Sequence, residues 1–283
     1  MKRVNKLKLR NKVGARAFLL CGAFFFAAAL LGAKETPPDQ VVVSTPSYTP
    51  GIDALEPNLG QYRYRASWNG VPAGTITLTL NRRGNDYHIS TNAQTARVID
   101  IFYKLRFHAE ARVSAATFHP KRSLYVTRAN SRRKKTQMTF LPGGEISSRR
   151  KGSSGDVRSY TFNPENLTLD PFSAAFLALS LNWEVGQTRR FDTFNGKSRY
   201  LIELTAVDKT HITVNGTRRE AFVISPEVTD LTDSEPSNKL HGAKIYFAAD
   251  SSREILRIVS DLFIGSIKAE MVSHTPPDSW KAN

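Results

Sequence analysis

The chain has 283 residues, with 40 Lys and Arg against 25 Asp and Glu, a formal net charge of +15, 40% hydrophobic residues and one Cys. These proportions fit a globular domain and exclude an intrinsically disordered chain. The sequence has only 17 Gly, its charges are spread along the chain, and it has a single long apolar run. These features exclude collagen, a coiled coil and a multi-pass membrane protein.

The N-terminus predicts export. A basic leader without an acid precedes an uninterrupted apolar run, residues 17–33, which ends in a small residue, and this pattern predicts a signal peptide over 1–33. The alternative is an uncleaved inner-membrane anchor, since the run is near the lower limit for spanning a bilayer. The leader carries seven basic residues: Lys2, Arg3, Lys6, Lys8, Arg10, Lys12 and Arg16.

Cleavage after Ala33 would leave 33 basic groups (40 less the seven of the leader) against 25 acidic ones, a net charge of +8. It would also remove Cys21, so the mature chain would have neither a disulfide nor a Cys-ligated metal. We therefore expect a protein of the Gram-negative periplasm. We expect no nucleic-acid partner, since no zinc-finger, helix-turn-helix or RNA-recognition pattern is present.

Residues 34–60 are rich in Pro and predict a disordered tether, and residues 274–283 predict an irregular tail. Between them the dominant period is two, as in a strand with one wet face. Alternating runs recur through residues 61–273, with Asn-Gly turns at 69–70, 195–196 and 215–216 that are typical of hairpins. The clearest run places Tyr103, Leu105, Phe107, Ala109, Ala111 and Val113 on one face.

One helix is predicted after Asp170, which can cap it, and Pro171, which suits its first position. Its apolar residues recur at three- and four-residue steps, and Phe172, Phe176 and Leu179 are candidates for core packing or for contact with an apolar ligand. A shorter helical turn is predicted over 95–102. The fold class is therefore mainly β: a curved antiparallel sheet or barrel-like domain over 61–273, with one apolar helix packed on or in it.

The order of these segments resembles a bacterial envelope family, domain of unknown function 3108. The resemblance is carried by YRASWNGVPAGTITLTL, by FYKLRFHAEA, by the Asp170-Pro171 helix and by KIYFAADSSREILRIVSDLFIGSIKAEM, and it spans nearly the whole predicted domain. It implies a periplasmic β-rich protein without assigned chemistry. The matching single residues are Trp68, Gly74, Pro120, Asp170, Gly186, Asp250, Arg257 and Gly265.

Catalytic signatures are absent from the sequence. No two of the six His have metal-ligand spacing, and neither G-x-S-x-G nor H-E-x-x-H occurs, so we predict no catalytic residue, metal or cofactor. His108 alternates with Arg106 and Glu110, which favours a solvated surface residue. An envelope glycan or peptide hydrolase stays open as an alternative, because neighbouring strands could bring together two of the carboxylates Asp170, Asp192, Asp250 and Asp261.

Basic residues concentrate between 121 and 160, a segment that contains eleven Lys and Arg but only two acidic residues. Such a cluster attracts phosphate-rich surfaces, although edge charges also prevent sheets from aggregating. The candidate anion-binding residues are Arg132, Arg133, Lys134, Lys135, Arg149, Arg150 and Lys151. We predict a non-enzymatic protein that binds or carries an anionic amphiphile, or that acts as an envelope scaffold. Its expected partner is an anionic envelope lipid, lipopolysaccharide, glycan or envelope protein, with contact to a membrane surface.

Overall fold

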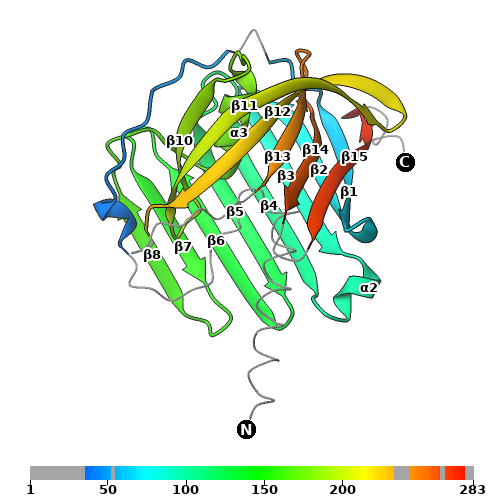
Figure 1. The fold of residues 1–283 in the computed structure, drawn as a ribbon. Coiled ribbons are helices and arrows are strands. Elements are labelled where there is room, and N and C mark those ends of the chain that lie inside the picture. Colours follow the sequence, from blue (N-terminus) through cyan, green and yellow to red (C-terminus); the bar gives the residue numbers. More distant parts are fainter. Residues whose placement is uncertain (1–35, 52–54, 233–241, 262–264, 278–283) are drawn as a thin grey trace.

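The computed structural model describes residues 36–51, 55–232, 242–261 and 265–277. These residues form one sheet of fifteen strands in the order β8-β7-β6-β5-β4-β3-β2-β1-β15-β14-β13-β12-β11-β10-β9 (Figure 1). Neighbouring strands pair antiparallel except β9 and β10, which are parallel. The prediction of a mainly β domain is therefore confirmed. The strands are β1 (Gly60–Trp68), β2 (Val71–Arg83), β3 (Asp86–Thr95), β4 (Leu105–Ser114), β5 (Pro120–Ala129), β6 (Arg132–Phe140), β7 (Ile146–Lys151), β8 (Val157–Phe162), β9 (Thr168–Leu169), β10 (Thr188–Phe194), β11 (Arg199–Val214), β12 (Thr217–Asp230), β13 (Lys244–Ala248), β14 (Ile255–Asp261) and β15 (Ser266–Thr275).

The strand order places the two ends of the domain side by side in the middle of the sheet. β1 pairs with the last strand, β15, and from this junction one meander runs outward to β8 while another runs to β9. Figure 1 shows the sheet curled, with β5 to β8 facing β10 to β12 across the interior. The sheet is barrel-like, and β8 and β9 are its two edges.

Period-two alternation separates an inner face from an outer face. All six apolar residues of the run from Tyr103 to Val113 are buried, and Glu110 and Arg112 between them are exposed. The turns at Asn69-Gly70 and Asn215-Gly216 have positive φ at both residues, as predicted for tight hairpins. At Asn195 the turn differs, because only Gly196 has positive φ while the Asn195 side chain accepts hydrogen bonds from the amides of Lys197 and Ser198.

The predicted helix is α3 (Pro171–Ser180), and the Asp170 carboxylate caps it by accepting from the amide of Ser173 at 2.8 Å. The helix lies inside the curl of the sheet (Figure 1). The Phe172 ring stacks on Tyr125 with centroids 6.1 Å apart, and the Phe176 ring lies 5.2 Å from that of Tyr87. The helix therefore fills the interior with apolar side chains. The shorter predicted turn is α2 (Arg97–Asp100), between β3 and β4.

Side chains join the edge strand β8 to β10 and β11, which lie next to the other edge strand, β9; we call this junction the seam. The Phe162 ring on β8 packs edge-on against Phe194 on β10 at 5.1 Å. Arg199 on β11 lies over Phe162 and forms an ion pair with buried Asp192. Part of the predicted tether also packs here, since Arg199 donates to the carbonyl of Val41 at 2.6 Å. The segment holds a short 3-10 helix, η1 (Pro38–Gln40), which contacts β8.

The ends of the chain are described in part. The predicted signal peptide, residues 1–33, lies outside the described residues. Of the predicted tail, His274 and Thr275 belong to β15, and the His274 ring lies 4.5 Å from that of Tyr62. Among the described helices, none combines the length and the apolarity needed to cross a bilayer.

Candidate functional site

Strand register divides the predicted anion-binding residues between the two faces of the sheet. Directly paired residues of antiparallel strands share a face. Lys134 on β6 pairs with Thr127, which pairs with buried Phe107, so Lys134 is on the inner face. The same reasoning puts Arg132 and Arg150 on the inner face, because Arg132 is two residues from Lys134 and Arg150 pairs with buried Thr136. The outer face takes the remaining four: Arg133, Lys135, Arg149 and Lys151.

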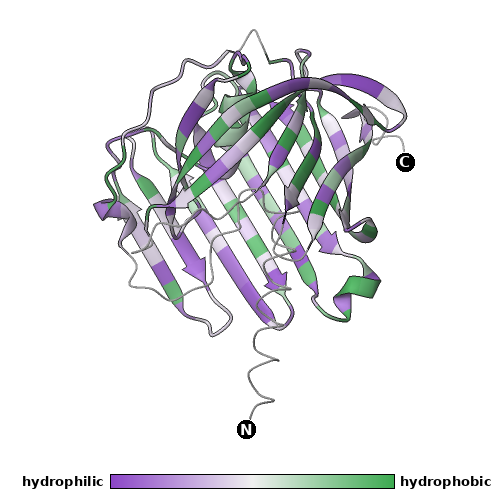
Figure 2. Ribbon diagram, viewed as in Figure 1, coloured by the Kyte–Doolittle hydropathy of each residue, from purple (hydrophilic) through white to green (hydrophobic). Residues whose placement is uncertain are grey.

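The β10–β11 turn adds a fourth cation to the inner face. The Gly196 carbonyl accepts from the Ser148 hydroxyl at 3.1 Å, and a Cβ on Gly196 would collide with the Thr136 side chain. The turn therefore lies directly on β6 and β7, next to Lys134. We call Arg132, Lys134, Arg150 and Lys197 the inner cluster. Figure 2 shows hydrophilic colouring along the ends of β6 and β7 that carry it.

Lys134 lies among positive charges within the inner cluster. Lys134 is half-buried. Burial lowers the pKa of Lys134, and the charges of Arg150, Lys197 and Arg132 lower it further. Each neighbouring charge that shifts this pKa is thus positive. An anion held among these side chains would relieve that repulsion and accept charge-assisted hydrogen bonds.

The other predicted contact residues, on α3, are packed. The Phe172 ring stacks on Tyr125, and the Phe176 ring packs at a tilt against Tyr87 and against Phe118, whose centroid is 6.0 Å away. Leu179 lines an apolar cavity of about 80 Å³ between the helix and strands β10 to β14, with Trp183 and Phe247. Pockets that enclose drug-sized ligands measure roughly 300–1,000 Å³. This cavity is therefore a packing void rather than a lipid chamber.

Two of the four carboxylates considered for hydrolysis are buried in structural roles. Asp170 accepts from the hydroxyls of Ser123 and Tyr125 as well as from the helix N-terminus. Burial raises the pKa of Asp170, and these hydrogen bonds act in the opposite direction. Asp192 is held by Arg199.

Two acids also share an open cleft of about 690 Å³ at the opposite end of the barrel, where the β2–β3 turn lies. They are Asp250 and Glu254, and Arg219 donates to both, at 2.8 and 2.9 Å. Burial raises the pKa of Asp250, but hydrogen bonds from Ser252 and Arg219 and the Arg219 charge outweigh it and lower the pKa overall. A carboxylate with a lowered pKa next to a cation stabilises structure and is a poor general acid. Asp261, the fourth carboxylate considered, ends β14.

In the described ranges, no three His, Cys, Asp or Glu side chains converge as ligands of one metal ion would. His108 lies on the outer face, as its alternation predicts, 2.9 Å from the Asn92 side-chain oxygen and 3.1 Å from Glu110. The residue that sequence reasoning missed is Lys197. Its approach to Lys134 depends on the fold, and the Asn-Gly turn beside it was the only local signal.

Together, fold and site define a β-barrel-like protein built from one open antiparallel sheet. The sequence matches the model of a family described as "Protein of unknown function (DUF3108)" over residues 63–272, and the chain belongs to this family. A search of curated proteins gives no match.

A search of solved structures gives matches at low sequence identity. A β-barrel-like protein of the domain of unknown function DUF1849 from Brucella abortus superposes with a TM-score of 0.53 at 9% identity, covering 77% of this chain and 98% of its own. A protein described as exported, with a YmcC-like fold, from Bacteroides fragilis has a TM-score of 0.33 at 9% identity, with 78% and 98% covered. One described as a lipoprotein, from Parabacteroides distasonis, has 0.32 at 8% identity, with 81% and 100% covered. The first likeness supports the barrel-like fold.

Proposed function

We propose that this chain is an exported, non-enzymatic protein of the cell envelope that binds the phosphate-bearing head group of an anionic amphiphile at the inner cluster. The observation that carries the proposal is the convergence of Arg132, Lys134, Arg150 and Lys197 on the concave inner face, where all but Arg132 are half-buried. Like charges in such a place repel one another more strongly than on an open surface, because water screens them less. A site that holds them together is suited to an anion.

Export is the second part of the proposal, and its support is the sequence. A basic leader followed by the apolar run of residues 17–33 is typical of a signal for the secretion machinery. The single Cys lies within that run, so a chain cleaved after it would have no thiol to protect in the periplasm. The envelope also supplies the ligand class, since phospholipid and lipopolysaccharide phosphates are abundant there.

The small cavity limits how such a ligand is bound. Because the cavity of about 80 Å³ behind α3 is too small for a lipid, the acyl chains of the ligand do not enter it. Phe172, Phe176 and Leu179 then serve as core residues that hold the helix against the sheet. The protein would recognise a head group at the end of the barrel, in contrast to a carrier that encloses a whole lipid.

Isothermal titration calorimetry with two probes tests the proposal. Pyrophosphate presents phosphate alone, and dihexanoyl phosphatidic acid below its micellar concentration presents phosphate with short acyl chains. We expect Arg132→Gln and Lys134→Gln each to weaken binding about tenfold, as the loss of one charge-assisted hydrogen bond implies. Equal affinity for the two probes would mean that the phosphate group alone is sufficient for binding. A higher affinity for dihexanoyl phosphatidic acid would mean that the acyl chains also contact the protein.

The chain supplies matched controls at the next residues. Arg133→Gln and Lys135→Gln remove the same charges from the same strand, but from its outer face. These variants should bind both probes within about twofold of the wild type, because exposed charges are screened by salt. Head-group binding at this cluster would be refuted if the inner-face and outer-face variants lost affinity equally, or if the wild type bound neither probe.

A further inference from the structure

Large apolar side chains are exposed together at one end of the barrel. Ile101 is 77% exposed, Phe102 72% and Val98 54%, and all three belong to the connection between β3 and β4, residues 96–104, which we call the β3–β4 loop. In Figure 2 this loop, with α2, stands out as a hydrophobic projection. Val71, 53% exposed, begins β2 at the same end, where the amide of Ala96 donates to the carbonyl of Ala73.

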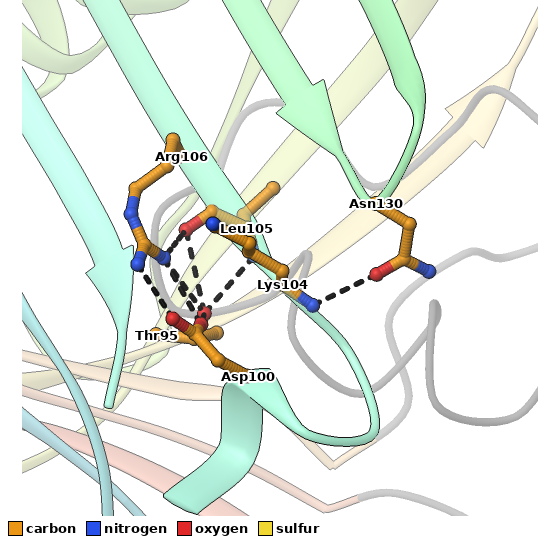
Figure 3. A network of polar contacts seen from close by, with 6 residues as sticks. All are labelled: Thr95, Asp100, Lys104, Leu105, Arg106 and Asn130. Carbon is orange, nitrogen blue, oxygen red and sulfur yellow. Dashed lines mark hydrogen bonds and ion pairs between the residues drawn. The ribbon is translucent and has the colours of Figure 1, made fainter. Parts of the chain in front are cut away.

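The loop is held in this orientation from both sides. Ile99 and Tyr103 point inward and are buried in a small cluster with Leu105 and Ala73. On the other side, the Arg106 guanidinium donates to both oxygens of Asp100, at 3.0 and 2.6 Å, and Asp100 also accepts from the Thr95 hydroxyl (Figure 3). The outward direction of Ile101 and Phe102 is therefore fixed by a core below them and a polar network beside them.

Cations surround this apolar projection. The amide of Lys104 donates to the Asn130 side chain at 2.9 Å, and the Asn130 amide donates to the Lys104 carbonyl at 2.8 Å, which ties the loop to the β5–β6 turn (Figure 3). Next to that turn, the Ser153 hydroxyl bonds to the backbone of Arg133 and ties in the β7–β8 turn. The exposed cations on the β3–β4 loop, the β5–β6 turn and their adjoining strand ends are Arg97, Lys104, Arg128, Arg132 and Arg133, and the β7–β8 turn with its strand ends carries exposed Lys151, Asp156 and Arg158.

We propose that this end of the barrel docks on an anionic phospholipid bilayer, with Val98, Ile101 and Phe102 inserted among the acyl chains and the surrounding cations on the lipid phosphates. Peripheral membrane binding requires buried apolar area together with attraction to anionic lipid, and this surface has both. The acid inside the loop, Asp100, is already paired with Arg106 and does not oppose the approach. Charge complementarity thus selects a phosphate-rich surface over a second, equally basic copy of this chain. The inserted residues Val98, Ile101 and Phe102 lie outside the inner cluster, and Arg132 is the one residue that the two proposed surfaces share, so the insertion can be tested separately from the head-group site.

Vesicle flotation with the full chain tests the docking surface. We expect the wild type to float with vesicles of phosphatidylethanolamine and phosphatidylglycerol more than with vesicles of phosphatidylcholine alone. The double variant Ile101→Ser/Phe102→Ser should reduce the partition coefficient on anionic vesicles about tenfold or more, since two large side chains no longer leave water. Because wild type and variant share the same N-terminus, the comparison isolates the loop.

The double variant Leu141→Ser/Val185→Ser is the matched control. It removes two exposed apolar side chains from other connections, where Leu141 is 45% and Val185 56% exposed, and should float like the wild type. Equal flotation of the loop variant and the wild type would overturn the proposal.

A site-specific fluorescence measurement gives a second readout. Phe102→Trp should shift its emission to shorter wavelength on anionic vesicles, whereas Val185→Trp should not. An unshifted Phe102→Trp emission in floated protein would overturn the proposal. So would a concentration-dependent dimer that Ile101→Ser/Phe102→Ser converts to a monomer, because the loop would then be an interface between copies.

Discussion

The buried ion pair at the seam of the sheet gives the sharpest stability prediction. Asp192 on β10 is fully buried and Arg199 on β11 is 2% exposed. The Arg199 guanidinium also donates to the carbonyls of Pro38 and Val41, and Asp192 accepts from the Thr168 hydroxyl. The pair thus joins β9, β10 and β11 to the segment that lies along the edge of β8. Arg199→Met removes the cation and keeps much of the side-chain volume.

The expected cost of Arg199→Met is about 3–5 kcal/mol, because it leaves the Asp192 carboxylate buried without its counter-charge. Arg190→Met is the matched control. Arg190 lies on β10, two residues before Asp192, and its guanidinium pairs with Glu203 at 2.6 Å, but its side chain is more than half exposed. An exposed pair contributes about 0–1 kcal/mol. The structure therefore predicts a several-fold difference between two Arg→Met changes on paired strands of one hairpin.

Urea unfolding of the two variants measures the difference, and limited proteolysis reports the segment separately. Arg199→Met should open cleavage sites between residues 36 and 51, because the carbonyls of Pro38 and Val41 lose their donor. The double variant Asp192→Leu/Arg199→Met should recover part of the lost stability by removing the orphaned charge. If Arg199→Met lowered the free energy of unfolding no more than Arg190→Met, the conclusion that the Asp192–Arg199 pair stabilises the seam would be refuted.

Two further predictions test the turns and the loop. Gly196→Ala should cost about 2 kcal/mol or more, because the new Cβ meets Thr136 and φ is positive, whereas Gly216→Ala, with open space around it, should cost only the φ strain of about 1 kcal/mol. Thermal unfolding compares the two, and equal losses would contradict close packing of the β10–β11 turn. Hydrogen bonds from Arg106 and Thr95 and the charges of Arg106 and Lys104 outweigh the effect of desolvation and lower the pKa of Asp100 from 3.8 to about 2. A depressed carboxylate pKa stabilises the fold above the unfolded-state value, and this contribution is lost as pH falls through the folded-state value. Asp100→Asn should therefore be less stable than the wild type at pH 7 and approach it between about pH 4 and pH 2, as urea titrations at each pH would show; a difference independent of pH would count against the Asp100–Arg106 pair.

Much of the fold was predictable because its signals are local. Alternation in residues 103–113 and the Asn-Gly turns specify strands and hairpins from neighbouring residues alone. Asp170 and Pro171 specify the start of α3 in the same way. The seam was not predictable, because Arg199 bonds to residues near Pro38 that are far away in sequence, and a Pro-rich composition by itself predicts a tether.

The candidate site was predictable in part. The concentration of cations in residues 121–160 is a composition signal, and the alternation around buried Thr136 and Met138 already places Lys134 and Lys135 on opposite faces. Lys197 reaches the inner cluster only through the fold. The exposure of Ile101 and Phe102 was not predictable for another reason. Apolar residues beside Ile99 and Tyr103 could equally belong to the core, and the packing of Ile99 and Tyr103 together with the Asp100–Arg106 network determines which of them point outward.

The two proposed surfaces lie at the same end of the barrel, and one pair of substitutions separates them. Arg132 and Lys134 on the inner face begin the strand whose turn is tied to the β3–β4 loop through Asn130 and Lys104. A barrel docked by that loop would thus present the inner cluster to the lipid head groups. Lys134→Gln should bind the soluble phosphate probes about tenfold more weakly while still floating with anionic vesicles, because insertion of Ile101 and Phe102 is intact. Ile101→Ser/Phe102→Ser should show the opposite pattern, with unchanged affinity for the soluble probes and reduced flotation with anionic vesicles. If either change abolished both activities in a folded protein, head-group binding and membrane docking would be one event at one surface, and the independence argued from their separate residues would fail.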